Sequence, residues 1–243
     1  MLHGAAIALV PAYECLSPRL AFRLAPRFAR RIVPVSLGVI GIGSTSPSAQ
    51  DQCVVVDDFS KAKVGEFPAG WKARKDEAKD VYKVADEKGK HVLRADAKDV
   101  GIQIGKQFEW DLKEYPVLAW AWRPIEFPKG ADERTKKNDS ALAVYAVFPH
   151  TPVSVKSVKY IWSEKVPKGT HIPQSSGNTQ GVVLRTGGGT QWVEERVNVL
   201  EDYKRYFKTD DTQKPEGVGV LTDSDDTSSR ARGEYARFRV CRK

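Results

Sequence analysis

Hydrophobic and polar residues alternate along most of the chain after residue 53, which is typical of β-strands that bury one face. The clearest alternation covers 116–123, where Trp120 and Trp122 share one face of the predicted strand and Arg123 takes the other. A glycine-containing turn at 86–90 separates two further stretches of this kind. We predict strands at 54–59, 81–85, 91–95, 101–107, 116–123, 141–148, 158–162, 181–185, 191–199, 218–221 and 235–240.

One stretch after residue 53 has the spacing of a helix and not of a strand. Leu200, Tyr203 and Phe207 stand at positions i, i+3 and i+7 within 200–208, and Pro215 bars an extension of the helix. We find no internal repeat and no interior linker. Many short strands with one small helix predict an all-β fold, a jelly-roll-like antiparallel β-sandwich with one short helix, formed by a single domain over 51–243.

The first 50 residues have a different pattern. A basic stretch at 27–31 precedes an apolar run at 32–43, and small and polar residues follow at 44–50. This order is typical of a secretory signal peptide, and a run of about 12 residues is shorter than the roughly 20 that span a bilayer. We therefore expect 1–50 to be a signal peptide or N-terminal leader and the protein to be periplasmic or secreted. An uncleaved anchor is the alternative, so membrane contact is expected only through the leader.

The charge of the chain adds little to this picture. Half of the net charge of +8 comes from residues 1–50, which hold five arginines and one acid. The remaining excess of basic residues is mild, and the arginine-rich stretch 230–243 follows shortly after the acidic stretch 223–226. A nucleic-acid partner would require a basic patch for phosphate contacts. We predict a solvated surface of mixed charge and no nucleic-acid partner.

Cysteine usage is consistent with export. Cys15 lies in the leader, which leaves Cys53 and Cys241 at the two ends of the mature chain, each within a strand-like run. An even pair of cysteines in an oxidising compartment is a disulfide candidate, and the first and last strands are neighbours in many β-sandwiches. We predict a Cys53–Cys241 disulfide, with two separate buried thiols as the alternative.

An ordered series of segments resembles a known bacterial family. The series begins with Leu-Ala-Trp-Ala-Trp-Arg at 118–123 and continues through 138–148, 159–163, 192–203 and 219–225. Together these segments resemble the domain of unknown function 3047 over about residues 54–241. The resemblance implies an exported bacterial domain whose activity is not established. It supplies no catalytic residues, so the chemistry depends on the side chains themselves.

The predicted strand 191–199 places Trp192, Glu194, Arg196 and Asn198 on one face. An aromatic ring, a carboxylate, a guanidinium and an amide in a row suit a sugar, carboxylate or phosphate ligand, although an ordinary solvated face is the alternative. Trp120 and Trp122 are expected to fill the space between the two sheets. The candidate ligand-binding residues, expected to form one wall, are Arg123, Asp139, Tyr145, Tyr160, Trp162, Trp192, Glu194, Arg196 and Asn198.

A run of acids precedes the last predicted strand. Ca²⁺ takes about six to eight oxygen ligands, which carboxylates at strand ends can supply. The spacing of Asp223, Asp225 and Thr227 is similar to that of alternating calcium loops, but the glycine and distal glutamate of an EF-hand are missing. A turn stabilised by Asp and Ser side chains is the alternative. The candidate Ca²⁺ ligands are Asp223, Asp225 and Asp226, and no other cofactor is indicated.

Signals for an enzyme are weak. His91, His150 and His171 have no metal-ligand spacing, and the glycines at 187–189 lack the lysine of a phosphate loop. The sequence leans against an enzyme and predicts an exported domain that binds a carbohydrate or cell-envelope glycan. The alternatives are a glycan hydrolase on the same scaffold, which requires two carboxylates across a cleft, and a structural envelope protein without a small ligand.

Overall fold

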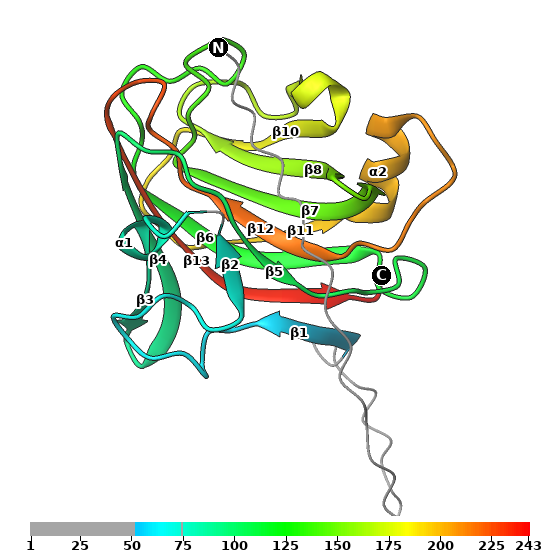
Figure 1. Ribbon diagram of the computed structural model, residues 1–243, viewed down its shortest axis with the longest axis horizontal. Helices are drawn as coiled ribbons and strands as arrows, with labels where there is room; N and C mark the ends of the chain where they lie inside the picture. Colours follow the sequence, from blue (N-terminus) through cyan, green and yellow to red (C-terminus); the bar gives the residue numbers. More distant parts are fainter. Residues whose placement is uncertain (1–51, 74) are drawn as a thin grey trace, which may run out of the picture.

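A computed structural model of the chain describes residues 52–73 and 75–243, which form two β-sheets (Figure 1). Sheet A contains β1 (Cys53–Asp57), β3 (Tyr82–Glu87), β4 (Lys90–Lys98), β6 (Val117–Glu126), β11 (Val193–Asn198) and β13 (Arg230–Cys241). Sheet B contains β2 (Trp71–Ala73), β5 (Ile104–Gln107), β7 (Leu142–Thr151), β8 (Ser154–Ser163), β9 (His171–Gln174), β10 (Thr179–Thr186) and β12 (Gly217–Leu221). The predicted leader, 1–50, lies outside the described residues and stays a prediction.

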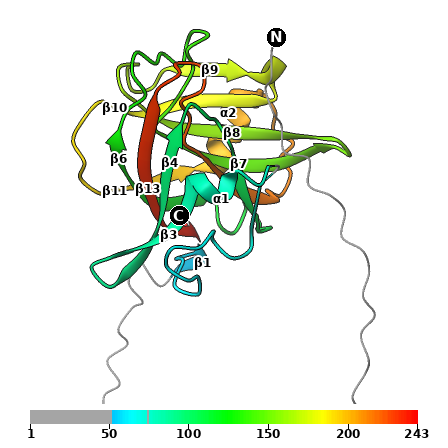
Figure 2. The same ribbon diagram turned by 60° about the vertical axis from the view of Figure 1, so that its left-hand side comes forward.

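The strand order mixes segments that are far apart in the sequence. Sheet A runs β11-β6-β13-β4-β3, with β1 paired to β13, and sheet B runs β2-β5-β12-β7-β8-β10-β9. β8 and β10 pair in parallel, whereas the other strand pairs are antiparallel. Figure 2 shows β4 and β13 of sheet A crossing β7 and β8 of sheet B at a large angle. The predicted β-sandwich is confirmed, with one parallel strand pair that the sequence did not indicate.

Aromatic side chains fill the space between the two sheets. Trp120 and Trp122 come from β6, and their ring centroids lie 5.2 Å apart. Tyr160 of β8 lies 5.6 Å from Trp120, and Trp162 lies 5.5 Å from Trp122. Large aromatic rings remove much apolar surface from water when they pack across a sandwich. The expected packing of Trp120 and Trp122 between the sheets is confirmed.

Two short helices accompany the sheets. The predicted helix is α2 (Val199–Phe207), whose first turn is capped by the Asn198 side chain, which accepts a hydrogen bond from the backbone N–H of Glu201. Tyr203 packs against Phe148 at the end of β7, with ring centroids 4.4 Å apart. The other helix, α1 (Ala78–Val81), is a single turn, and η2 (Ser175–Gly177) is a 3₁₀ turn. Within the described part of the chain, no helix is both long and apolar enough to cross a membrane.

The two ends of the described chain are joined covalently. Cys53 and Cys241 stand opposite each other in the pairing of β1 with β13, and a disulfide joins them. The sequence separation of the two cysteines is 188 residues. This finding confirms the predicted disulfide.

Candidate functional site

The structure does not bring the nine predicted ligand-binding residues to one wall. They lie in three places: the core holds Tyr160 and Trp162, the outer face and edge of sheet A hold Arg123, Trp192, Glu194, Arg196 and Asn198, and the far side of sheet B holds Asp139 and Tyr145. The physical reason is that a sandwich has two outer faces, and alternation within a strand does not tell which sheet or face another strand will join.

Tyr160 and Trp162 belong to the core, which corrects their expected role in stacking against a ligand. Their side chains share the inward face of β8 and are 0% and 3% exposed. The Tyr160 hydroxyl donates to Asp202 at 3.1 Å, and the Trp162 indole N–H donates to the carbonyl of Gly187 at 2.7 Å. Their polar atoms are therefore satisfied internally, as buried aromatic residues require.

The outer face of sheet A brings Trp192 and Arg123 together, as the alternation along their strands indicated. The guanidinium carbon of Arg123 lies 4.9 Å from the centroid of the Trp192 ring, which is a cation–π contact. The partly exposed Trp192 packs against a row of small residues that crosses four strands. We call this region the Trp192 surface; its members are Ala85, Val92, Ala121, Arg123, Trp192, Glu194 and Ala236.

Arg123 is fixed in place by carboxylates of β13 and β3. Its Nε donates to Glu234 at 2.5 Å, and its Nη2 lies 3.1 Å from Glu87. Arg94 donates to the other oxygen of Glu234 at 2.8 Å. The Glu234 side chain is only 1% exposed, so two guanidinium groups compensate for the burial of its charge. The consequence is a guanidinium that is fixed over the indole ring of Trp192.

A β-bulge shapes the other side of the Trp192 surface. The pairing of β13 with β6 shifts between Ala236 and Arg239, and Arg237 adopts a positive φ of 57° there. The bulge turns Phe238 into the core and leaves both Arg237 and Arg239 next to Glu194, at 3.7 and 2.5 Å. Bulges re-aim side chains in this way and are common next to functional sites.

Arg196 and Asn198 lie farther along β11, at the disulfide and helix end of the strand. Arg196 is exposed and its Nη1 lies 3.6 Å from the Sγ of Cys241. Asn198 caps α2 through its side chain. Asn198 therefore has a structural role in the helix start, and neither residue contacts Trp192 in the described structure.

The outer face of sheet B holds two buried residues with polar groups, Tyr145 and Lys159. Only Tyr145 was named as a candidate from the sequence. Tyr145 and Lys159 are 6% and 2% exposed, and the Lys159 ammonium lies 5.8 Å from the Tyr145 ring. Burial lowers the pKa of Lys159, although nearby Asp223 and Glu133 oppose the shift. The signal in the sequence was present, since Lys159 is the polar residue within the otherwise apolar or aromatic stretch 158–162.

Glu133 is buried in the loop that precedes β7. Its carboxylate accepts hydrogen bonds from the hydroxyls of Ser163, at 2.6 Å, and Ser140, at 3.4 Å. Burial raises the pKa of Glu133 in spite of these hydrogen bonds. No pattern in the sequence marks this glutamate, because it lies in a loop whose path depends on the two sheets.

Four aspartates lie close together where the loop between β12 and β13 contacts the residues that precede β7. Carboxylate oxygens of Asp139, Asp225 and Asp226 lie within 4.8 Å of one another. Burial and the adjacent Asp225 carboxylate raise the pKa of Asp223 to about 8, against the effect of Lys159. The structure thus keeps the predicted metal candidates together and adds Asp139 to them. We call these residues the aspartate cluster: Asp139, Asp223, Asp225 and Asp226.

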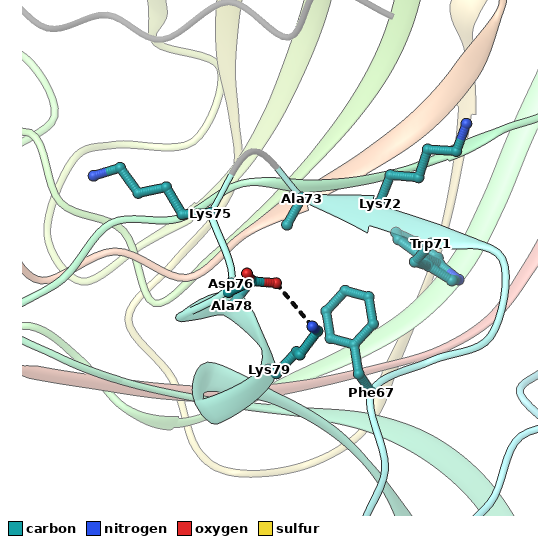
Figure 3. Close-up of a pocket in the computed structure, with 8 residues that line it drawn as sticks. All are labelled: Phe67, Trp71, Lys72, Ala73, Lys75, Asp76, Ala78 and Lys79. Atoms are coloured by element: carbon teal, nitrogen blue, oxygen red, sulfur yellow. Dashed lines mark hydrogen bonds and ion pairs between the residues drawn. The ribbon is translucent and has the colours of Figure 1, made fainter. Parts of the chain in front are cut away.

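Two cavities open elsewhere on the molecule. One, of about 310 Å³, is lined by Phe67, Trp71, Lys72, Ala73, Lys75, Asp76, Ala78 and Lys79 (Figure 3). Figure 3 shows the Phe67 ring beside the ion pair of Asp76 and Lys79, while Lys72 and Lys75 point away from it. The second, of about 550 Å³, lies next to β1 and includes Asp57 and Lys106. Neither cavity includes a residue predicted to bind a ligand or a metal.

Comparison with known families agrees with the resemblance noted in the sequence. The family model described as "Protein of unknown function (DUF3047)" matches residues 69–239. The chain belongs to this family. Among curated proteins, none matches this sequence.

Solved structures of carbohydrate-active proteins resemble this DUF3047 chain in fold. The family 11 carbohydrate-binding module of a Clostridium thermocellum cellulosomal cellulase is 9% identical, with a TM-score of 0.40, covering 79% of this chain and 95% of that one. The family GH12 endoglucanase 3 of Trichoderma harzianum is 11% identical, with a TM-score of 0.39, covering 78% and 96%. TmCBM61, solved with β-1,4-galactotriose, is 11% identical, with a TM-score of 0.37, covering 77% and 99%. The fold class itself rests on the strand pairings given above.

Proposed function

We propose that this DUF3047 domain binds a carbohydrate or cell-envelope glycan, and that the Trp192 surface is its binding site. The observation that carries the proposal is the partly exposed Trp192 ring with the Arg123 guanidinium held 4.9 Å from it. A flat aromatic ring packs against the C–H face of a pyranose, and a fixed guanidinium donates hydrogen bonds to hydroxyl or carboxylate oxygens. The guanidinium covers one face of the ring, so the sugar would stack on the remaining exposed part of the indole while it accepts hydrogen bonds from Arg123.

The Trp192 ring rests on small side chains of sheet A. Ala85, Val92, Ala121 and Ala236 form a row of small side chains over four neighbouring strands. These four residues are only 0–8% exposed, so they support the indole ring from below and do not themselves face solvent. A ligand would therefore touch the partly exposed Trp192 ring and the charged side chains around it.

The charges around the Trp192 surface restrict the class of glycan. The side chains of Arg94, Arg123, Arg237 and Arg239 pair with those of Glu87, Glu194 and Glu234. Within the described residues, the contacts of Arg123 use Nε and Nη2, so its Nη1 protons are available to a ligand. A small positive excess favours neutral or acidic glycans over cationic ones.

Binding is favoured over hydrolysis at this surface. A glycosidase needs one carboxyl that protonates the leaving group and a second that acts on the other side of the sugar. Glu194 and Glu234 each form ion pairs with two arginines, which leaves neither carboxylate free to act on a bound sugar. The Cys53–Cys241 disulfide supports a periplasmic or secreted location for the proposed binding function.

The test first measures binding of the full chain to a panel of neutral and acidic polysaccharides. Calorimetry then uses an oligosaccharide from the polysaccharide class that bound. Trp192→Ala is expected to weaken binding by at least about tenfold, because it removes the stacking ring. The matched control is Tyr206→Ala, which removes an aromatic ring of α2 that stacks on His171, away from the Trp192 surface. Equal losses in both variants would contradict the site, and no binding to any glycan would favour a structural envelope protein.

A further inference from the structure

The aspartate cluster joins parts of the chain that belong to different strands. Asp223, Asp225 and Asp226 lie in the loop between β12 and β13, whereas Asp139 precedes β7 by a few residues. Asp139 is fully buried, and its carboxylate accepts hydrogen bonds from the backbone N–H groups of Asp226, at 3.2 Å, and Thr227, at 2.8 Å. These bonds hold the loop so that Asp225 and Asp226 stay close to Asp139.

Backbone contacts hold the rest of this loop. The N–H of Asp223 donates to the carbonyl of Ser140 at 3.0 Å, and the N–H of Ser224 donates to the carbonyl of Val100 at 3.2 Å. The Asn138 side chain donates to Asp226 at 2.7 Å. The positions of the carboxylates are therefore set by the fold and not by free side-chain rotation alone.

Asp223 provides an independent observation that points to a ligand. Its side chain is 8% exposed, and its Oδ1 is buried without a hydrogen-bond partner in the described structure. A Cβ placed on Gly101 would lie 2.2 Å from this oxygen and 3.2 Å from Oδ1 of Asp225, so both oxygens converge over the same glycine. Buried carboxylate oxygens normally have a partner, because an unpartnered one carries a desolvation cost. The free oxygen of Asp223 is aimed at the carboxylate of Asp225.

The four carboxylates also lack a matching set of cations. Within the part of the chain that the structure describes, no Lys or Arg forms an ion pair with any member of the aspartate cluster. Lys159 is near enough to interact with Asp223 and Asp139 electrostatically, but one ammonium faces four acids. Carboxylates that converge without a cation repel one another.

We propose that the aspartate cluster binds one Ca²⁺ ion, which is coordinated by Asp139, Asp225 and Asp226 and balanced by the free oxygen of Asp223. All the proposed ligand atoms are oxygens, which Ca²⁺ prefers, whereas structural Zn²⁺ sites are built mainly from Cys and His. Ca²⁺ tolerates the irregular geometry of a loop, whereas Mg²⁺ demands a near-ideal octahedron. The ion would tie the β12–β13 loop to the start of β7. This site is independent of the proposed glycan binding.

The test uses the full chain after EDTA treatment, with CaCl₂ as the only added ligand. Calorimetry is expected to show saturable binding of one ion, and the melting temperature is expected to rise with Ca²⁺ concentration because the ion binds the folded state. MgCl₂ at the same concentration is expected to give a smaller shift. A larger shift with Mg²⁺ or Zn²⁺ would overturn the assignment of Ca²⁺.

The decisive variant is Asp225→Asn with Asp226→Asn, two exposed positions that leave the core intact. Without Ca²⁺ this double variant is expected to melt at the same or a higher temperature than the natural chain, because like charges are removed. Its Ca²⁺ affinity is expected to fall by at least about tenfold. The matched control is Asp210→Asn with Asp211→Asn, an exposed acidic pair after α2, which should keep the Ca²⁺ response. Absence of any Ca²⁺ response, or an unchanged response in the decisive variant, would overturn the proposal.

Discussion

Two buried carboxylates on opposite sides of the sandwich have very different surroundings. Glu234, behind the Trp192 surface, is 1% exposed and is held by the guanidinium groups of Arg94 and Arg123. Asp223, in the aspartate cluster, is 8% exposed and has one oxygen without a partner among the described residues. The first arrangement is complete by itself and positions Arg123. The second has no such partner among the described residues, and the proposed Ca²⁺ would supply one, so burial of an acid alone does not reveal its role.

The largest expected effect is a loss of stability when Glu234, the ion-paired acid, is removed. Glu234→Ala leaves Arg94 and Arg123 without their shared carboxylate, and we expect the free energy of unfolding to fall by about 3 kcal/mol. The measurement is urea unfolding. The matched control is Glu87→Ala, which removes the more exposed partner of Arg123 and should cost less than about 1 kcal/mol. Similar losses in both variants would show that the burial of Glu234 is not what matters.

Substitution of Asp223, the acid without a partner, is expected to leave the free energy of unfolding unchanged or to raise it. At about pH 9, above the folded pKa of about 8 of Asp223, and in the presence of EDTA, Asp223→Asn keeps the shape of the side chain and removes a charge next to Asp225, so the free energy of unfolding should stay the same or rise by up to about 1 kcal/mol. The same urea titration measures it. A loss as large as that of Glu234→Ala would mean that the charged carboxylate already has a stabilising partner, and the contrast between the two acids would disappear.

A smaller effect concerns the contact that Glu234 positions. The coupling of Arg123 with Trp192 can be measured by a double-mutant cycle of Arg123→Ala and Trp192→Ala, and we expect about 0.5–1 kcal/mol in the free energy of unfolding. Additive effects of the two substitutions would show that the arginine lies beside the ring without interacting with it. In that case the support for a preformed sugar site at the Trp192 surface would be lost.

The smallest expected effect is a change of folding stability with pH that comes from Glu133. Its carboxylate has hydroxyl partners and, among the described residues, no paired guanidinium. Burial raises the pKa of Glu133 in the folded state above 4.5, so the folded state binds the proton more tightly than the unfolded state. Its contribution to stability is therefore fully present below about pH 4.5 and is lost as the pH rises through the folded pKa. Glu133→Gln cannot titrate, so its stability relative to the natural chain should rise with pH over this range. A flat difference between pH 4 and 8 would contradict the prediction.

The strands were well predicted because their alternation is local. Each predicted strand overlaps one in the structure, and the missed ones, β2 and β9, are edge strands of three and four residues. Segments this short carry too little alternation to stand out. The parallel pairing of β8 with β10 was out of reach, because it depends on the path of the intervening chain through β9.

The arrangement of the candidate site was predicted only where one strand determined the geometry. The shared face of Trp192 and Glu194 and the reach of Arg123 follow from alternation along β11 and β6, and both are found. Tyr160 and Trp162 were assigned to a ligand because a core aromatic and a binding aromatic look alike in sequence; only the packing of β8 against β6 separates them. The addition of Asp139 to the aspartate cluster required the same kind of long-range information.

The disulfide between β1 and β13 has a mechanical consequence. The described strands and helices all lie between Cys53 and Cys241 along the chain. A pulling force applied to the two ends of the chain would therefore pass through the covalent sulfur bridge, and the hydrogen-bonded strands between the two cysteines would carry almost none of it. A domain tethered at one end to an envelope and pulled at the other would keep its sheets intact for as long as this bridge stays oxidised.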